Sequence, residues 1–165
     1  MHAEYLWAPG RLEWVTRLHK NMPKGCIFCR IAGDDARVPS RTLYKDKTVM
    51  VIMNIFPYNP GHLQVVPVRH VEWPDQLTKE EQAAFYGMVN KTIKLLKKSQ
   101  NPEGFNIGMN LGRTAGQSIT HLHYQIVPRY ASDAGFTDTI AGTKVMPETL
   151  DQTYKRLMKH VDILK

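Results

Sequence analysis

The chain has few cysteines and no long apolar run, and both features limit the classes of protein to which it can belong. Among 165 residues there are only two cysteines, Cys26 and Cys29, which form a single C-x-x-C pair. No stretch approaches the roughly 20 apolar residues that cross a bilayer, and the first residues lack the basic start and apolar run of a secretory signal. We therefore expect a cytoplasmic protein without a membrane span. Its cysteines should serve metal or redox chemistry and not a structural disulfide.

Acidic residues are also scarce relative to basic ones, with 15 of the former and 22 of the latter, for a net charge of +7. Such an excess attracts polyanions, but much of it is concentrated in KTIKLLKKS, residues 91–99. This segment has the pattern of a helix with a solvated basic face, and the alternative interpretation is a groove for nucleic acid. No basic extension or finger accompanies it, so nucleic acid is the less favoured partner.

Length and hydrophobic periodicity predict one α+β domain over residues 1–165. Thr78 and Glu81 have the spacing of a capping box, and apolar residues then recur at helical spacing, which predicts one long central helix. A short helix is expected at 11–20 and a C-terminal one at 150–163. Alternating and apolar runs predict about five antiparallel strands: two within 41–54, turned around Lys45 to Lys47, and one each within 62–68, 105–110 and 121–127.

The pentapeptide HLHYQ places His121, His123 and Gln125 at alternate positions of the last predicted strand. Alternate residues share one face of a strand, about 6.5 to 7 Å apart. An unpaired polar group in a core costs on the order of 1 to 3 kcal/mol, so two imidazoles and a carboxamide on one face favour a lined site. The alternative interpretation is an exposed sheet face on which the histidines are incidental.

The preceding loop NLGRTAGQS, residues 110–118, contains two glycines that allow backbone to approach a ligand closely. Its main-chain N–H groups and polar side chains would converge on the end of the HLHYQ strand, where they could hold phosphate. It is not a Walker loop, because no Gly-Lys-Ser/Thr follows. Taken alone, a glycine-containing hairpin turn is as often merely a turn.

Taken together, these motifs resemble the histidine-triad superfamily. GQSITHLHYQIVPR, residues 116–129, is similar to its signature, whose members carry His-x-His-x-His or His-x-His-x-Gln, and MNIFPYNPGHLQVVPVRH, residues 53–70, resembles its nucleotide-binding hairpin. The resemblance covers a core from about 26 to 129 and implies a five-stranded antiparallel sheet around one long central helix. The ends LWAPGRLEWV and FTDTIAGTKVMPETL are similar to a branch of diadenosine tetraphosphate phosphorylases.

The resemblance implies a nucleophile and a set of residues around it. His123 would attack the α-phosphorus of a nucleotide and hold the nucleotidyl group until an acceptor arrives. For the apolar residues of the set, core packing is the alternative role. Residues implied to assist catalysis are Asn110, Gln117, Ser118 and Gln125. Those implied to bind substrate are Asn54 at the ribose, Ile55 and Phe28 at the base, His62 near the phosphate or the nucleoside, and Gly116 and Arg129.

Gln125 departs from the three-histidine form of the signature. A histidine there could protonate a leaving group, whereas a carboxamide donates a hydrogen bond and cannot titrate. A polyphosphate leaves as a stable anion without a proton, but an amine leaving from a phosphoramidate needs one. The glutamine therefore disfavours phosphoramidase activity. Within the family, the glutamine form of the signature resembles transferases and phosphorylases that use phosphate as acceptor, although hydrolysis stays open.

The same resemblance implies further metal ligands beside the C-x-x-C pair. Related proteins with this pair bind structural zinc through the two cysteines, a histidine that ends the VPVRH strand and the first histidine of the triad. The corresponding residues are Cys26, Cys29, His70 and His121. His19 is an alternative to His70 as the third ligand. An unmetallated reduced pair and redox exchange are the other interpretations of the cysteines.

Two classes of function remain in contention. The leading one is an enzyme that cleaves dinucleoside polyphosphates or related nucleotides through a nucleotidyl-His123 intermediate, with phosphate or water as acceptor. The other is a nucleotide-binding regulatory module with little turnover. The resemblance also implies a homodimer. In the C-terminal part, Lys144 or Arg129 is expected either to contact polyphosphate or to remain in solvent.

Overall fold

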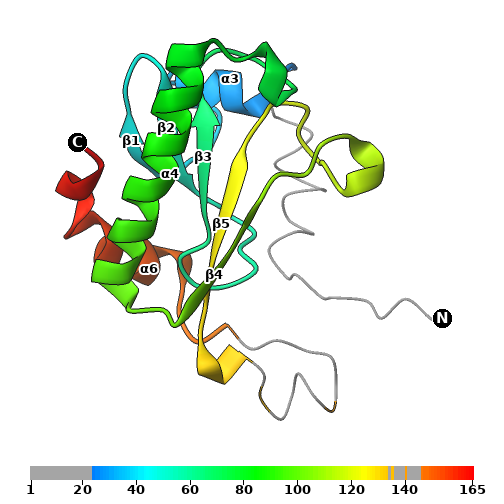
Figure 1. Cartoon of the computed structure of the whole chain (residues 1–165). Coiled ribbons are helices and arrows are strands. Elements are labelled where there is room, and N and C mark those ends of the chain that lie inside the picture. Colours follow the sequence, from blue (N-terminus) through cyan, green and yellow to red (C-terminus); the bar gives the residue numbers. More distant parts are fainter. Residues whose placement is uncertain (1–23, 134, 136–139, 141–145) are drawn as a thin grey trace.

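The computed structural model describes residues 24–133, 135, 140 and 146–165, which form an α+β fold on one antiparallel sheet. The sheet has the order β1-β2-β3-β5-β4, and every neighbouring pair is antiparallel. This confirms the predicted class, five strands with one long helix, α4 (Lys79–Gln100) (Figure 1). The strands are β1 (Thr42–Lys45), β2 (Val49–Met53), β3 (Leu63–Pro67), β4 (Gly104–Gly108) and β5 (Tyr124–Arg129).

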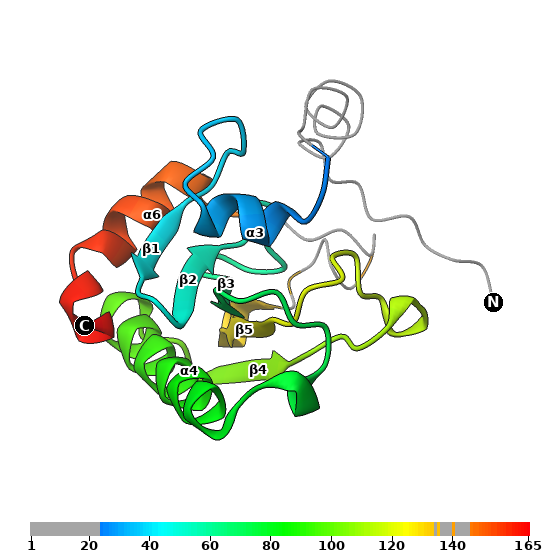
Figure 2. The ribbon, with the colours of Figure 1, turned by 90° about the horizontal axis from the view of Figure 1, so that it is seen from above.

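Helices cover both faces of the central strands, which explains why β2 and β3 are almost entirely apolar. Val49 and Val51 of β2 belong to a core cluster shared with α4. Met50 and Ile52 belong to a second cluster, shared with the short helix α3 (Ile27–Ala32). Because side chains alternate between the faces of a strand, a strand buried on both sides is a continuous apolar run. Figure 2 shows the sheet between α3 and α4.

The ends of α4 follow from local chemistry. The Thr78 hydroxyl accepts a hydrogen bond from the N–H of Glu81, and the Glu81 carboxylate accepts one from the N–H of Thr78, which confirms the predicted capping box. At the other end Asn101 has a left-handed backbone with φ of 48°, a conformation that asparagine tolerates. Of the predicted apolar face, Phe85, Met88, Val89 and Leu96 are buried and Ile93 is half-buried, while Lys94, Lys97 and Lys98 are exposed.

The C-terminal helix α6 (Leu150–Met158) and the turn η5 (Val161–Leu164) lie beside β1 at the edge of the sheet. The hydroxyl of Tyr154 donates to the carbonyl of Thr42 in β1 at 3.0 Å, and Leu157 is fully buried in the core cluster of α4. A strand edge covered in this way cannot pair with a foreign strand. The helix predicted at 150–163 is present but ends at Met158, and the separate 3₁₀ turn η5 follows it.

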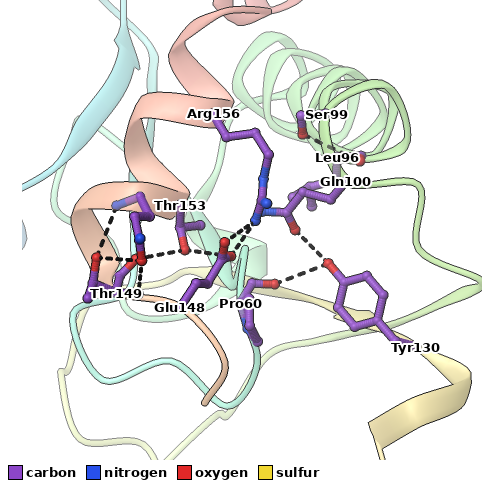
Figure 3. A network of polar contacts seen from close by, with 10 residues as sticks. Pro60, Leu96, Ser99, Gln100, Tyr130, Glu148, Thr149, Thr153 and Arg156 are labelled. Carbon is purple, nitrogen blue, oxygen red and sulfur yellow. Dashed lines mark hydrogen bonds and ion pairs between the residues drawn. The ribbon is translucent and has the colours of Figure 1, made fainter.

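A polar network fastens the end of α4 to the loop 54–62 (Figure 3). The hydroxyl of Tyr130 donates to Oε1 of Gln100 at 2.6 Å and lies 3.4 Å from the carbonyl oxygen of Pro60. Gln100 also fills the space beside Gly61, whose φ of 84° is left-handed. A Cβ at that position would lie only 2.1 Å from Oε1 of Gln100. The backbone conformation therefore favours glycine there, and a larger residue would displace the Gln100 side chain.

Strand β5 begins at Tyr124, three residues later than the predicted strand 121–127. The N–H groups of His121 and Leu122 bond to carbonyls outside the sheet ladder, so these residues do not extend it. The alternation of side chains nevertheless continues through this segment. The rings of His121 and His123 both contact Phe28 of α3, whereas Leu122 is buried in the cluster on the opposite face.

Three predictions concern residues outside the described ranges. The helix expected at 11–20, with His19, and the contact expected of Lys144 lie outside the described residues. Among the helices of the described residues, none is long and apolar enough to cross a membrane.

Candidate active site and metal centre

A cavity of about 1120 Å³ opens on the α3 face of the sheet. Its wall is formed by α3, by the end of β2 and the loop after it, by the loop 110–120 and by the start of β5. Of the residues implied to act in catalysis or binding, it contains His123, Gln125, Asn110, Ser118, Gly116, Asn54, Ile55 and Phe28. Segments far apart in the sequence thus meet around one histidine.

His123 is 5% exposed, and its Nδ1 lies 2.8 Å from the carbonyl oxygen of His121. A carbonyl only accepts, so Nδ1 carries the proton and Nε2 keeps its lone pair. Burial lowers the pKa of the His123 ring, with the bond to the His121 carbonyl acting in the opposite direction. The ring is therefore neutral near pH 7, in the protonation state and tautomer that a nucleophilic imidazole requires.

His62 is a second histidine of this region and is completely buried. Its Nδ1 accepts a hydrogen bond from the N–H of Tyr58 at 3.2 Å. The pKa of His62 is lowered to about 3, first by burial and then by the charge of His123, partly offset by the carboxamide of Gln125. A positive charge on His123 would therefore oppose protonation of His62. His62 itself is not part of the cavity wall.

The loop 110–118 is held in shape by its own polar groups. The amide of Asn110 donates to the carbonyl of Gly116 at 3.2 Å, and Oε1 of Gln117 accepts from the N–H of Gly112 at 2.9 Å. Both glycines have left-handed φ angles, 86° and 83°. Asn110, Gly116 and Ser118 face the cavity, whereas Gln117 stands outside its wall and braces the loop. The structure therefore gives Gln117 a supporting contact within the loop.

The apolar part of the wall combines α3 with the end of β2. Phe28 is 2% exposed and packs in the second core cluster, while Ile55 and Phe56 are half-buried at the cavity. The side-chain oxygen of Asn54 accepts from the N–H of Phe56 at 2.8 Å, which fixes the turn between them. Core packing and cavity lining, proposed as alternatives for these apolar residues, are thus combined in Phe28.

The structure places Arg129 away from the cavity. It follows Gln125 by four strand residues, which is about 13 Å along β5. Its guanidinium bonds to Asp133 at 2.6 Å and to Asn106 at 2.6 Å, and the residue is not among those that form the wall. The expected contact between Arg129 and the phosphates is therefore not supported by its position.

Gln64 and Tyr58 are among the residues of the wall that were not anticipated from the sequence. Gln64 is 8% exposed in β3 and lies opposite Gln125 in the strand register. Its signal was a glutamine inside the apolar run HLQVVPV, since a buried carboxamide needs a partner or a ligand. Tyr58 also lines the cavity, and nothing in the sequence distinguishes it from an ordinary loop tyrosine.

Four possible metal ligands converge beside the cavity: Cys26, Cys29, His70 and His121. Their ligand atoms all lie within 4.8 Å of one another, and Sγ of Cys26 and Nδ1 of His121 are 3.3 Å apart. Sγ of Cys29 is likewise 3.3 Å from Nδ1 of His70. A tetrahedral site with bonds of about 2.0–2.3 Å separates its ligands by roughly 3.3–3.8 Å, so this group could hold a metal ion.

The second nitrogen of His121 supports this arrangement. Nε2 lies 2.9 Å from the carbonyl of Pro67, so it carries the proton and leaves the Nδ1 lone pair directed at the cysteines. Burial, followed by hydrogen bonding and charge from Cys26, raises the pKa of Cys29 to about 11. A bound cation would favour the thiolate and so oppose this shift.

The fold and the site define a protein of the histidine-triad type, and comparisons with known proteins identify the family. The family model described as HIT domain matches residues 35–132. The chain belongs to this family. It is 44% identical over 162 residues to the AP-4-A phosphorylase of Mycobacterium tuberculosis, an alignment that covers 92% of this chain and 81% of that protein.

Other relatives extend the comparison. A bis(5'-nucleosyl)-tetraphosphatase (asymmetrical) of Schizosaccharomyces pombe is 31% identical over 119 residues, covering 72% of this chain and 63% of the relative. Among solved structures, a Zn-bound histidine triad family protein from Mycobacterium smegmatis superposes with a TM-score of 0.69. It is 26% identical and is aligned over 85% of this chain and 95% of its own.

Proposed function

We propose that this chain is a nucleotidyltransferase that cleaves dinucleoside polyphosphates by phosphorolysis through a covalent nucleotidyl-His123 intermediate. The observation that carries the proposal is the buried, neutral His123, whose Nδ1 is engaged by a backbone carbonyl while its ring lines a large cavity. The 44% identity to a protein named AP-4-A phosphorylase supports the choice of substrate class.

In the first step Nε2 of His123 attacks the α-phosphorus, forming a P–N bond as the P–O bond to the leaving group breaks. With diadenosine tetraphosphate the leaving group is ATP, which departs as an anion and needs no proton from Gln125. In the second step an oxygen of inorganic phosphate attacks the same phosphorus and releases His123. The product of that step is ADP.

The surrounding residues are proposed to stabilise charge and hold the nucleotide. Asn110, Ser118 and the backbone near Gly116 face the cavity and would donate to the phosphoryl oxygens, where charge develops in the transition state. Asn54 would contact the ribose, and the apolar wall with Ile55 and Phe28 would hold the base. His62 stands outside the wall, so it is proposed to support Tyr58 and not to contact the substrate.

Incubation with diadenosine tetraphosphate, with and without inorganic phosphate, tests the reaction. ADP plus ATP formed only with phosphate supports the proposal, and ³²P-labelled phosphate should appear in ADP. Phosphate-independent release of AMP plus ATP would instead show hydrolysis, the activity named for the S. pombe relative. Binding without turnover under either condition would favour a regulatory module.

The metal proposed for Cys26, Cys29, His70 and His121 is structural zinc. Two thiols and two imidazoles at these separations are a donor set that zinc accepts, and the relative from M. smegmatis is described as Zn-bound. When bound, zinc would join the segment before α3 to the residue two positions from His123. The His121 carbonyl that orients the nucleophile would thereby be held in place. Metal analysis of purified protein, with near-stoichiometric zinc expected, tests this.

We also propose that the protein is a homodimer. Strand β4 is at the edge of the sheet, and its Ile107 is 42% exposed, while Tyr86 of the neighbouring α4 is 62% exposed. An open edge beside exposed apolar side chains is a surface that a second copy can cover. Light scattering should give twice the chain mass of 18.9 kDa, and a mass of one chain would contradict the proposal.

A further inference from the structure

The cavity wall contains one strongly exposed aromatic residue, Tyr58. Its exposed fraction is 63%, whereas Phe28 in the same wall is 2% exposed and Phe56 is half-buried. A tyrosine that packs only as part of a core would not leave most of its surface in solvent. Tyr58 thus combines a place in the cavity wall with a largely exposed side chain.

One face of the Tyr58 ring rests on a rigid support. Its ring is stacked on the fully buried ring of His62, with centroids 5.1 Å apart and planes 17° from parallel. The N–H of Tyr58 donates to Nδ1 of the same histidine at 3.2 Å, so backbone and side chain are tied to one partner. Pro57 and Pro60 restrict the loop on either side, and the carbonyl of Pro60 lies 3.4 Å from the hydroxyl of Tyr130 (Figure 3). Such a ring loses little freedom when a ligand stacks on it.

Phe28 and Tyr58 are linked to His123 through different contacts. The ring of Phe28 contacts His123 directly, with centroids 5.2 Å apart, and belongs to the part of the wall made by α3. Tyr58 reaches the same region through His62, whose pKa responds to His123 and Gln125. The cavity wall therefore contains aromatic side chains from two separate segments, Phe28 of α3 and Tyr58 of the loop after β2.

The volume of the cavity and the geometry of the reaction leave room for a second surface that binds a base. At about 1120 Å³ the cavity exceeds the roughly 300–1,000 Å³ typical of small-molecule sites. In an in-line displacement the leaving oxygen lies opposite the attacking Nε2, so the departing polyphosphate extends away from the nucleotide that is transferred. A second nucleoside at the far end of that polyphosphate needs a surface of its own.

We propose that Tyr58 is a stacking platform for the base of the leaving nucleoside, and that it sets the preference for dinucleoside over mononucleoside polyphosphates. The inference rests on the proposed function for the identity of the substrate. Stacking of a base on an aromatic side chain tolerates any base, since every base has a π face. Tyr58 thus confers selectivity for the presence of a second base and not for its identity.

A purely structural role for Tyr58, as a cover for His62, makes a different prediction. Removing a cover would disturb His62 and, through it, His123, so all ligands that occupy the site would be affected alike. Removing a stacking platform affects only ligands with a second base. The ratio of two affinities therefore separates the roles, independently of any turnover.

The experiment measures dissociation constants by calorimetry for two ligands that resist attack at the α-phosphorus. One is diadenosine tetraphosphate with methylene groups at both α,β bridges, and the other is α,β-methylene-ATP, which has no second base. Tyr58→Leu should weaken binding of the first about tenfold, equivalent to about 1.4 kcal/mol, and leave the second unchanged. Tyr58→Phe keeps the ring and should restore the affinity to within about twofold. Trp73→Leu, which removes a 46% exposed ring outside the cavity, is the matched control and should change neither value.

Equal losses for both ligands in Tyr58→Leu, or no loss for either, would overturn the inference. Failure of the proposed function has a different signature, because the wild-type protein would then bind both ligands but leave authentic diadenosine tetraphosphate uncleaved. In that case the affinity ratio still decides the role of Tyr58. If the wild-type protein bound neither ligand, both proposals would be wrong.

Discussion

Replacement of Gly61 by alanine tests whether the loop before His62 is held as the structure shows. The residue has a φ of 84°, and a left-handed backbone costs a residue with a Cβ roughly 1–2 kcal/mol. The new Cβ would also lie 2.1 Å from Oε1 of Gln100, so that side chain must move. Its displacement breaks the 2.6 Å hydrogen bond from Tyr130, a loss of about 1 kcal/mol. The free energy of unfolding should therefore fall by about 2–3 kcal/mol.

Urea unfolding at constant protein concentration measures this change, provided that the m-value is unchanged. Gly87→Ala is the matched control, because Gly87 is inside α4 and a Cβ there meets nothing within 4 Å. It should raise the free energy of unfolding by about 1 kcal/mol through helix propensity. In the double variant Gly61→Ala/Gln100→Ala the clash is absent, so the two losses should not add. A change within about 0.5 kcal/mol for Gly61→Ala would refute the reasoning, since that is the range of neutral surface substitutions.

Three further predictions concern the site. Gln125→His supplies a group that can titrate and protonate a leaving amine. An adenosine phosphoramidate, a poor substrate for the wild type, should then release its amine at least about 10²-fold faster, as measured by chromatography. An unchanged rate would contradict the role given to Gln125. Cys29→Ser should lose bound zinc by mass spectrometry and lower the melting temperature, and an unchanged metal content would remove Cys29 from the ligand set. Because burial lowers the pKa of His62 to about 3, its neutral form stabilises the fold fully above the unfolded value of about 6.5, and this contribution is lost as pH falls from there toward 3. The loss in unfolding free energy between pH 7 and 5 should be smaller in His62→Gln, and an equal loss would contradict the assignment.

Much of the fold follows from short-range rules that the sequence displays. The Thr78 capping box, the apolar period of α4 and the turn around Lys45 to Lys47 depend on neighbours within a few residues, and the structure confirms them. The start of β5 was placed too early, because the residues before Tyr124 satisfy their N–H groups outside the sheet. The bond from Leu122 reaches Val71, and a contact over such a sequence distance leaves no trace in local periodicity.

The site was only partly predictable, for the same reason. The pattern HLHYQ indicates a shared face, and the contacts of His121 and His123 with Phe28 agree with it. His70 lies 41 residues after Cys29 in the sequence. The prediction that it joins the C-x-x-C pair rested on the family resemblance and not on spacing. Tyr58 went unnoticed because only the tertiary structure places its ring on His62 and in the cavity.

The central claim is that His123 forms a bond to phosphorus, and intact-protein mass spectrometry tests it most directly. Protein mixed briefly with diadenosine tetraphosphate, without inorganic phosphate, is quenched in alkaline denaturant, which preserves the P–N bond. His160→Asn is the control, because His160 lies in the C-terminal segment outside the cavity wall. A gain of one adenylyl group is expected in the wild type and in His160→Asn, and not in His123→Asn. An adduct of the same mass on His123→Asn would contradict the account.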